Sequence, residues 1–137
     1  PFSWSSEDNA GFTRGTPWMD PCANYKDINA EAEDKDPDSV LNFYRKLLKV
    51  RKGLSSVIYG DTEFLEMEDP ELMVYKRESD EEMLISVNNF SGSERSYKLP
   101  EGFKDAKLLI SNCGDPIIND GIAELRPWEA FTLIKSK

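Results

Sequence analysis

Aromatic and amide side chains crowd the first 29 residues and form the combination that a carbohydrate site uses. The aromatic residues include Trp4, Phe12, Trp18 and Tyr25, and the amides among them are Asn9, Asn24 and Asn29. Aromatic faces stack on sugar rings, and amide groups form paired hydrogen bonds with hydroxyls. A loop that packs against another protein body would use the same aromatic residues, so composition leaves both interpretations open.

The rest of the sequence offers little for catalysis. It contains no histidine, which excludes Ser-His-Asp triads, Cys-His pairs and histidine-ligated zinc within the chain. Paired carboxylates would support acid–base chemistry, but they cluster around Pro70 and over residues 80–82. Charge runs in turns are normally solvated surface, so no carboxylate is assigned a catalytic role and no cofactor is expected.

The acidic pattern Asp34-x-Asp36-x-Asp38 imitates the start of a calcium-binding loop. Ser39 stands where that loop requires glycine, and Arg45 where it requires a bidentate glutamate. Pro37 also interrupts the pattern. We therefore expect no metal there.

Charge and cysteine usage favour a cytoplasmic protein. A net charge of −9 repels phosphate backbones and makes nucleic acid an unlikely partner. Cys22 and Cys113 lie far apart, and two reduced thiols are favoured over a disulfide. No signal peptide opens the chain, and no segment approaches the roughly 18 apolar residues of a membrane span. Asn89-Phe90-Ser91 matches a glycosylation motif but is interpreted as a strand end running into a turn.

Glycines and prolines predict an irregular loop over residues 1–36. A packed, aromatic-rich loop is an unusual beginning for a compact domain. We therefore expect that the chain does not start where its protein starts.

One strong helix is predicted over residues 37–53, with Asp36 as N-cap, Pro37 in the first helical position and Gly53 as the C′ residue. Its apolar face comprises Val40, Phe43, Tyr44, Leu47, Leu48 and Leu54. A surface helix docked on a core is favoured over a membrane-surface or calmodulin-target segment. An apolar face of this width also predicts self-association through the helix when it lacks a partner.

Short apolar segments separated by turn clusters follow Gly60. They predict about six to eight strands, with no intervening segment long enough for parallel crossovers. The fold class is therefore mainly β, an antiparallel β-sandwich preceded by a loop and a helix.

At this point the sequence resembles a known family. Residues 9–13, Asn-Ala-Gly-Phe-Thr, are highly specific for the oligo-1,6-glucosidase-type α-glucosidases of glycoside hydrolase family 13, the α-amylase family. Other matching positions are Pro1, Trp4, Pro17, Trp18, Asn24, Tyr25, Ile28, Asn29 and the segments 36–52, 57–61, 108–112 and 125–130. Phe2, Ser3 and Ser5 depart from the Met, Gln and Asp that are usual in the family.

The resemblance implies a C-terminal portion of such an enzyme. Residues 1–56 would be the tail of the catalytic (β/α)₈ barrel, and residues 57–137 the C-terminal antiparallel β-domain. Trp4 and Asn9 are then candidates for the substrate rim. The catalytic carboxylates would lie upstream of Pro1, so this segment would stabilise the enzyme, and the barrel would bind the oligosaccharide.

Two non-enzymatic alternatives remain. One is an interaction domain related to the heavy subunits of amino-acid transporters, which resemble the same family. The other is a free-standing carbohydrate-binding β-domain, for which the predicted strands offer mainly Tyr75, Tyr97 and Trp128. The residues preceding Pro1 would discriminate among these hypotheses.

Overall fold

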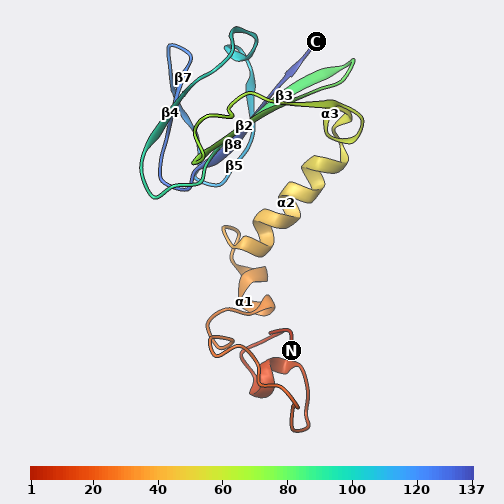
Figure 1. Ribbon diagram of the computed structural model, residues 1–137. Coiled ribbons are helices and arrows are strands. Elements are labelled where there is room, and N and C mark those ends of the chain that lie inside the picture. Colours follow the sequence, from red (N-terminus) through yellow and green to blue (C-terminus); the bar gives the residue numbers. More distant parts are fainter. The chain divides into compact units, whose positions relative to one another are not determined.

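The computed structural model describes residues 1–137 and divides into two compact units, Pro1–Lys49 and Val50–Lys137 (Figure 1). The division falls inside a helix that belongs partly to each unit. The predicted domain boundary between residues 56 and 57 stays a prediction.

The first unit holds a short 3₁₀ segment, Asp8–Gly11, a helix α1, Ala30–Lys35, and most of helix α2, Val40–Lys52. The prediction of a continuous loop over residues 1–36 is wrong at α1. Asn29 caps this helix, because its Oδ1 accepts a hydrogen bond from the Ala32 amide at 2.9 Å. No residue of α1 is buried, so it lacks the apolar periodicity from which a helix is predicted.

Helix α2 begins at Val40, three residues later than predicted. Asp36 is not the N-cap, since its carboxylate accepts from the Asp38 amide within the preceding turn. Ser39 caps the helix instead, with its Oγ accepting from the Asn42 amide at 3.2 Å. Gly53 does not take the left-handed conformation of a C′ glycine. The chain continues after Leu54 into a further short helix, α3, Ser55–Ile58, which the sequence did not predict.

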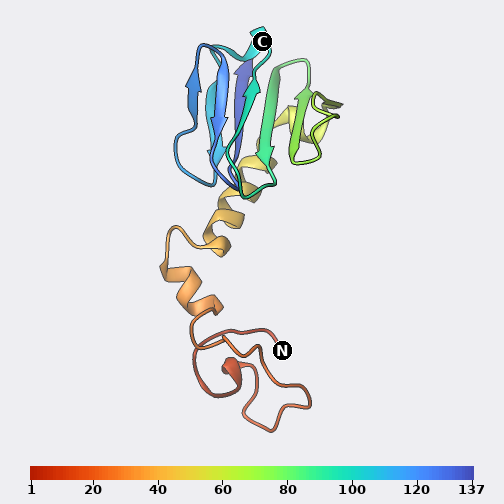
Figure 2. The same cartoon turned by 60° about the vertical axis from the view of Figure 1, so that its left-hand side comes forward.

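The second unit is an antiparallel β-sandwich, as predicted (Figure 2). One sheet has the strand order β1-β2-β3-β8-β5 and the other the order β4-β7-β6, with every neighbouring pair antiparallel. The strands are β1 Asp61–Phe64, β2 Leu72–Glu78, β3 Glu82–Asn89, β4 Arg95–Lys98, β5 Lys107–Ser111, β6 Ile117–Asn119, β7 Ile122–Leu125 and β8 Ala130–Ser136. A 3₁₀ turn, Glu101–Phe103, joins β4 to β5.

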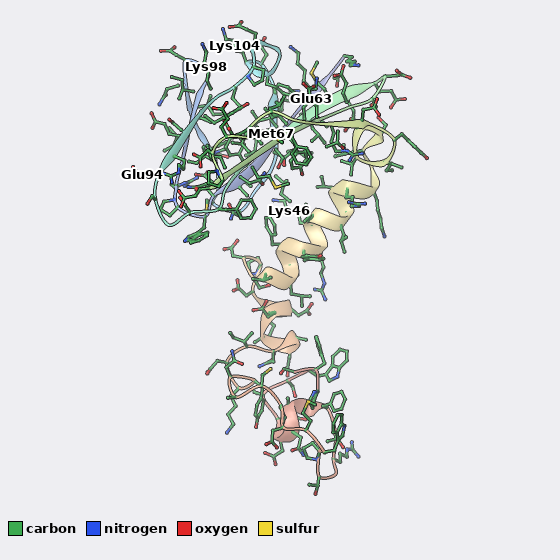
Figure 3. All side chains as sticks on the ribbon, in the orientation of Figure 1. Lys46, Glu63, Met67, Glu94, Lys98 and Lys104 are labelled. Carbon is green, nitrogen blue, oxygen red and sulfur yellow. The ribbon has the colours of Figure 1, made fainter.

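A single apolar core lies between the two sheets. Its buried members are Val74, Ile85, Val87, Leu99, Phe103, Ala123, Leu125, Phe131 and Leu133. Phe131 and Ile85 are the largest fully buried apolar side chains, at 1% and 0% exposure. Glu94 directly precedes β4 and Lys98 is its last residue, and both are exposed (Figure 3).

Two polar networks hold the ends of the sandwich. In the first, Glu82 accepts from the Ser56 amide and hydroxyl at 3.1 and 2.9 Å, which fastens α3 to β3. In the second, the Arg126–Glu129 turn leads into β8, and the Glu129 carboxylate is fully buried. It accepts from the Arg126 amide at 2.8 Å and from its guanidinium at 2.9 and 2.6 Å.

Candidate substrate-rim site

The loop that carries the candidates Trp4 and Asn9 is built on strained backbone. Asn9, Ala10 and Gly11 follow one another in the left-handed region, with φ of 54°, 58° and 65°. Asparagine and glycine tolerate this conformation, whereas alanine does so rarely. A Cβ at Gly11 would also lie 2.6 Å from the Ser5 hydroxyl. Strained backbone persists only where surrounding contacts hold it, and it concentrates at functional sites.

Backbone hydrogen bonds hold the Trp4 segment on both sides. The Trp4 amide donates to the Ala10 carbonyl at 2.9 Å, and the Trp4 carbonyl accepts from the Glu31 amide at 3.0 Å. The Ser3 carbonyl accepts from the Ala30 amide at 3.0 Å, so this segment is joined to the beginning of α1. The backbone beneath the Trp4 ring is therefore fixed on two sides.

The Trp4 side chain pairs with Phe2. Their ring centroids are 4.5 Å apart and the planes are tilted by 58°. Both rings are more than half exposed, at 55% and 56%. The pair offers the open aromatic surface on which a sugar ring would stack. Phe2 belongs to this cluster but was not among the site residues predicted from the sequence, although residues two apart in an extended segment share a face.

Asn9 plays a different part, because its side-chain amide group folds the loop. Its Nδ2 donates to the carbonyl oxygens of Thr13 and Gly15, both at 3.2 Å. Only the Oδ1 oxygen remains to accept a hydrogen bond from a ligand hydroxyl. Asn9 thus lies close to the Trp4 segment in the loop, but most of its hydrogen-bonding capacity is used internally.

No other aromatic residue of the first unit forms an aromatic pair with Trp4. Trp18 is 91% exposed and Phe12 is 50% exposed. Ala10 is the only buried apolar residue of this unit. The exposure of these residues is therefore equally consistent with a surface that another protein body covers and with a sugar-binding site.

The calcium-like pattern forms an internal network. Asp34 pairs with Arg45. The Asn42 Nδ2 donates to the carbonyl oxygens of Glu33, Asp34 and Asp36, at 2.9, 3.3 and 2.7 Å. An amide group thus occupies the position toward which these oxygens point. No group of three or more histidine, cysteine or acidic residues is arranged to hold a metal ion.

The glycosylation motif lies at the end of β3, with Asn89 buried. Its Nδ2, the atom that a glycan would modify, donates to the Ser93 carbonyl at 2.7 Å and the Arg126 carbonyl at 2.9 Å. In this arrangement the Asn89 side chain stabilises the turn that follows β3. The chain also has no helix of the length and apolarity needed to cross a membrane.

A charged hollow of about 410 Å³ lies beside β1 and β2 in the second unit. Lys76 lines this hollow and forms ion pairs with Glu63 at 2.8 Å and with Glu78 at 3.1 Å. Lys137 forms an ion pair with Glu78 at 2.7 Å. The hydrogen bonds that Lys76 donates to Glu63 and, secondly, to Glu78 raise the pKa of Lys76. Those from Lys137 and then Lys76 lower the pKa of Glu78. Asp61 and Asp80 also line the hollow without an ion pair, so it holds four carboxylates and two lysines and is acidic on balance.

Comparison with known families separates the chain into two parts. The model described as "Alpha amylase, catalytic domain" matches residues 1–60, and the one described as "Alpha-amylase SusG C-terminal domain" matches residues 72–131. Both parts occur together in individual relatives, since one of them covers this chain completely.

The relatives are considerably longer than this chain. The "Probable oligo-1,6-glucosidase 2" of Bacillus subtilis is 40% identical over all of this chain, which spans 25% of that protein. The trehalose-6-phosphate hydrolase of B. subtilis is 36% identical over 96% of this chain and 24% of its own length. The crystal structure of the Bacillus licheniformis trehalose-6-phosphate hydrolase matches with a TM-score of 0.91 and 38% identity, over 100% of this chain and 25% of that chain. These enzyme names favour neither non-enzymatic alternative.

Proposed function

Since the chain belongs to the α-amylase family, glycoside hydrolase family 13, and resembles its oligo-1,6-glucosidase-like members, we propose that it is the C-terminal segment of an α-glucosidase. The whole enzyme would hydrolyse short α-glucosides in carbohydrate metabolism. The observation that carries this proposal is the match of one relative over all of the chain, across both units.

The proposed role of the segment is structural. Family enzymes of this type use two carboxylates that flank the glycosidic bond. The Trp4 loop presents an aromatic pair and an amide group bound to its own backbone, and the Glu63 and Glu78 carboxylates of the charged hollow are bound to lysines. The sandwich would therefore stabilise the enzyme, while the (β/α)₈ barrel binds the oligosaccharide.

Within that enzyme, the Trp4–Phe2 pair and the Asn9 loop would lie at the rim of the substrate site. The fixed backbone beneath Trp4 and the exposed rings support this placement. Linkage preference would be decided mainly by residues outside this chain. We place the enzyme in the cytoplasm, which accords with two free cysteines, Cys22 and Cys113.

A chimeric enzyme tests this function. The B. subtilis relative that is 40% identical would have its matching segment replaced by this chain. The chimera should hydrolyse p-nitrophenyl α-glucoside and isomaltose, whereas the isolated chain should show no turnover. A folded chimera without activity, or turnover by the repurified isolated chain, would refute the proposed role.

A further inference from the structure

A tryptophan of the second unit is held on strained backbone in the turn that leads into β8. Trp128 has a φ of 59°, in the left-handed region that a bulky side chain enters only as an outlier. Its amide donates to the Ser91 carbonyl at 3.0 Å, and its own carbonyl accepts from the Asn112 side chain at 2.8 Å. Two segments distant in sequence thus hold this backbone in place, and strain of this kind concentrates at functional sites.

The indole ring of Trp128 is supported at one edge and otherwise open. A Cβ built on Gly92 would lie 3.8 Å from both Cζ2 and Nε1 of the ring, so this edge rests against Gly92. Trp128 is nevertheless 60% exposed, and its ring forms no aromatic pair. Burial therefore does not explain why the strained position holds a tryptophan. A steadied ring with an open face is a surface on which a sugar ring stacks.

A second hollow, of about 330 Å³, lies on the exposed face of the β4-β7-β6 sheet, and we call it the outer hollow. Ser96, Glu124 and Ile117 line it. Ser96 and Ile117 are both register partners of Glu124, and all three residues are exposed. Their side chains therefore form one row across the three strands.

The outer hollow begins beside the Trp128 ring. Glu94 and Arg126 also line the hollow, and Glu94 is labelled in Figure 3. Glu94 follows Gly92 by two residues, and Arg126 precedes Trp128 by two. Cα atoms two residues apart are separated by at most about 7 Å, so a ligand that stacks on the ring reaches the hollow with its next unit.

The charges of the outer hollow balance. They belong to two carboxylates, Glu94 and Glu124, and two guanidinium groups, Arg95 and Arg126. Arg95 pairs with Glu71 and Arg126 with the buried Glu129 carboxylate, whereas neither carboxylate of the hollow forms an ion pair. Balanced charge favours neither an anion nor a cation. A hydroxyl group, which both donates and accepts, matches a surface that offers free acceptors beside donors.

We propose that the Trp128 ring and the outer hollow form a second, non-catalytic binding site for a short oligosaccharide. One sugar ring would stack on the indole, and hydroxyls of the next unit would bind the carboxylates of the hollow. This site would add to the substrate site of the barrel within the same enzyme. The choice of α-glucosides as ligands rests on the proposed function, whereas the stacking surface depends on the sandwich alone.

Nuclear magnetic resonance of the full chain tests this site, because its three tryptophans, Trp4, Trp18 and Trp128, give separate indole N–H signals. Isomaltotriose or maltotriose should shift the Trp128 signal and the backbone amide signals of the outer hollow. Trp128→Asn should abolish the response of the hollow, whereas Trp18→Asn should preserve it. Asparagine tolerates the left-handed backbone, so Trp128→Asn should keep the urea midpoint of the wild type.

A second variant tests the hollow without altering the turn. Glu124→Ala should raise the dissociation constant obtained from the Trp128 signal by about fivefold, because it removes a hydrogen bond to the ligand. Glu81→Ala is the matched control, since Glu81 is an exposed glutamate without an ion pair that precedes β3 in the other sheet. It should change this constant by less than about twofold.

The outcomes separate this site from the proposed function. The absence of a Trp128 shift with either sugar at about 50 mM would overturn the site, as would a shift of Trp4 alone. A hollow response that survives in Trp128→Asn, or equal effects of Glu124→Ala and Glu81→Ala, would overturn it as well. A Trp128 shift together with a folded but inactive chimera would support the site and refute the proposed function.

Discussion

Replacing Glu129 with glutamine should destabilise the β-sandwich, because this carboxylate is fully buried and holds the turn that leads into β8. It accepts three hydrogen bonds from the Arg126 amide and guanidinium. The substitution keeps the volume of the side chain but removes its charge and turns one acceptor into a donor. That donor then faces a guanidinium that has no acceptor to offer.

The magnitude follows from the bonds that are lost. A hydrogen bond to a charged group contributes about 1.5–3 kcal/mol, so Glu129→Gln should lower the free energy of unfolding by about 2–3 kcal/mol. Glu129→Ala should cost more, about 3–5 kcal/mol, because it leaves the Arg126 guanidinium without a carboxylate, and only the Asp115 carbonyl still accepts from it. Urea unfolding followed by circular dichroism measures both values. Asp120→Asn, at an exposed turn, is a control in which only a surface charge is neutralised.

The pH dependence supplies a second measurement. Burial raises the pKa of Glu129, but the hydrogen bonds and charge of Arg126 outweigh it, so this pKa lies below its ordinary value of 4.5. A depressed carboxyl pKa stabilises the folded state above the unfolded pKa, and this stability is lost as the pH falls through the folded pKa. The difference between wild type and Glu129→Gln should therefore be constant near pH 7 and shrink below about pH 4.5. A difference under about 1 kcal/mol at pH 7, or one that grows on acidification, would refute this account.

Three further predictions concern packing and local stability. Gly60→Ala should destabilise the chain by about 3 kcal/mol or more, since the new Cβ would lie 2.3 Å from the Ser56 carbonyl oxygen and 2.7 Å from that of Glu78. The control Gly102→Ala places its Cβ where no atom lies within 4 Å and should be nearly neutral, so equal unfolding midpoints for the two variants would contradict this prediction. Phe131→Ala should lower the free energy of unfolding by about 3–5 kcal/mol, whereas Phe43→Ala, on the half-buried side of α2, should cost clearly less in the isolated chain. Equal losses of thermal stability in the two variants would contradict this, because they would mean that Phe43 is as fully packed as Phe131. Limited proteolysis should cut first before Asp36, where the chain has almost no apolar core, and first cleavage within residues 60–137 would argue against this order of local stability.

Local signals in the sequence were sufficient to predict the β-sandwich. Asn119-Asp120-Gly121 marks a hairpin, and the structure places positive φ at Asp120 and Gly121 between β6 and β7. The pattern of short apolar segments and turns determines strands of this kind without long-range information. The aromatic and amide residues of the first loop also pointed to a candidate site, and the family resemblance selected Trp4 and Asn9 from them.

Structural features that depend on contacts between residues far apart in the sequence could not be predicted from these local signals. The sequence predicts Asp36 as the cap, whereas the observed cap, Ser39, depends on its hydroxyl donating to the Glu33 carbonyl at 2.7 Å while it accepts from the Asn42 amide. Helix α3 exists where Glu82, 26 residues away, binds the Ser56 amide and hydroxyl. The segment that carries the Phe2–Trp4 pair is held by hydrogen bonds from the Ala30 and Glu31 amides, which lie more than 25 residues further along the chain.

The sequence by itself therefore determined the β-sandwich, its turns and the amphipathic character of α2, because these arise from residues close together in the chain. Tertiary structure decided which polar groups cap the helices, which glycine has no room for a side chain, and how much of the Asn9 amide remains available to a ligand. Those outcomes depend on hydrogen bonds and close contacts between atoms that the sequence separates. Their energies appear only when the folded backbone brings the partners within a few ångströms of one another.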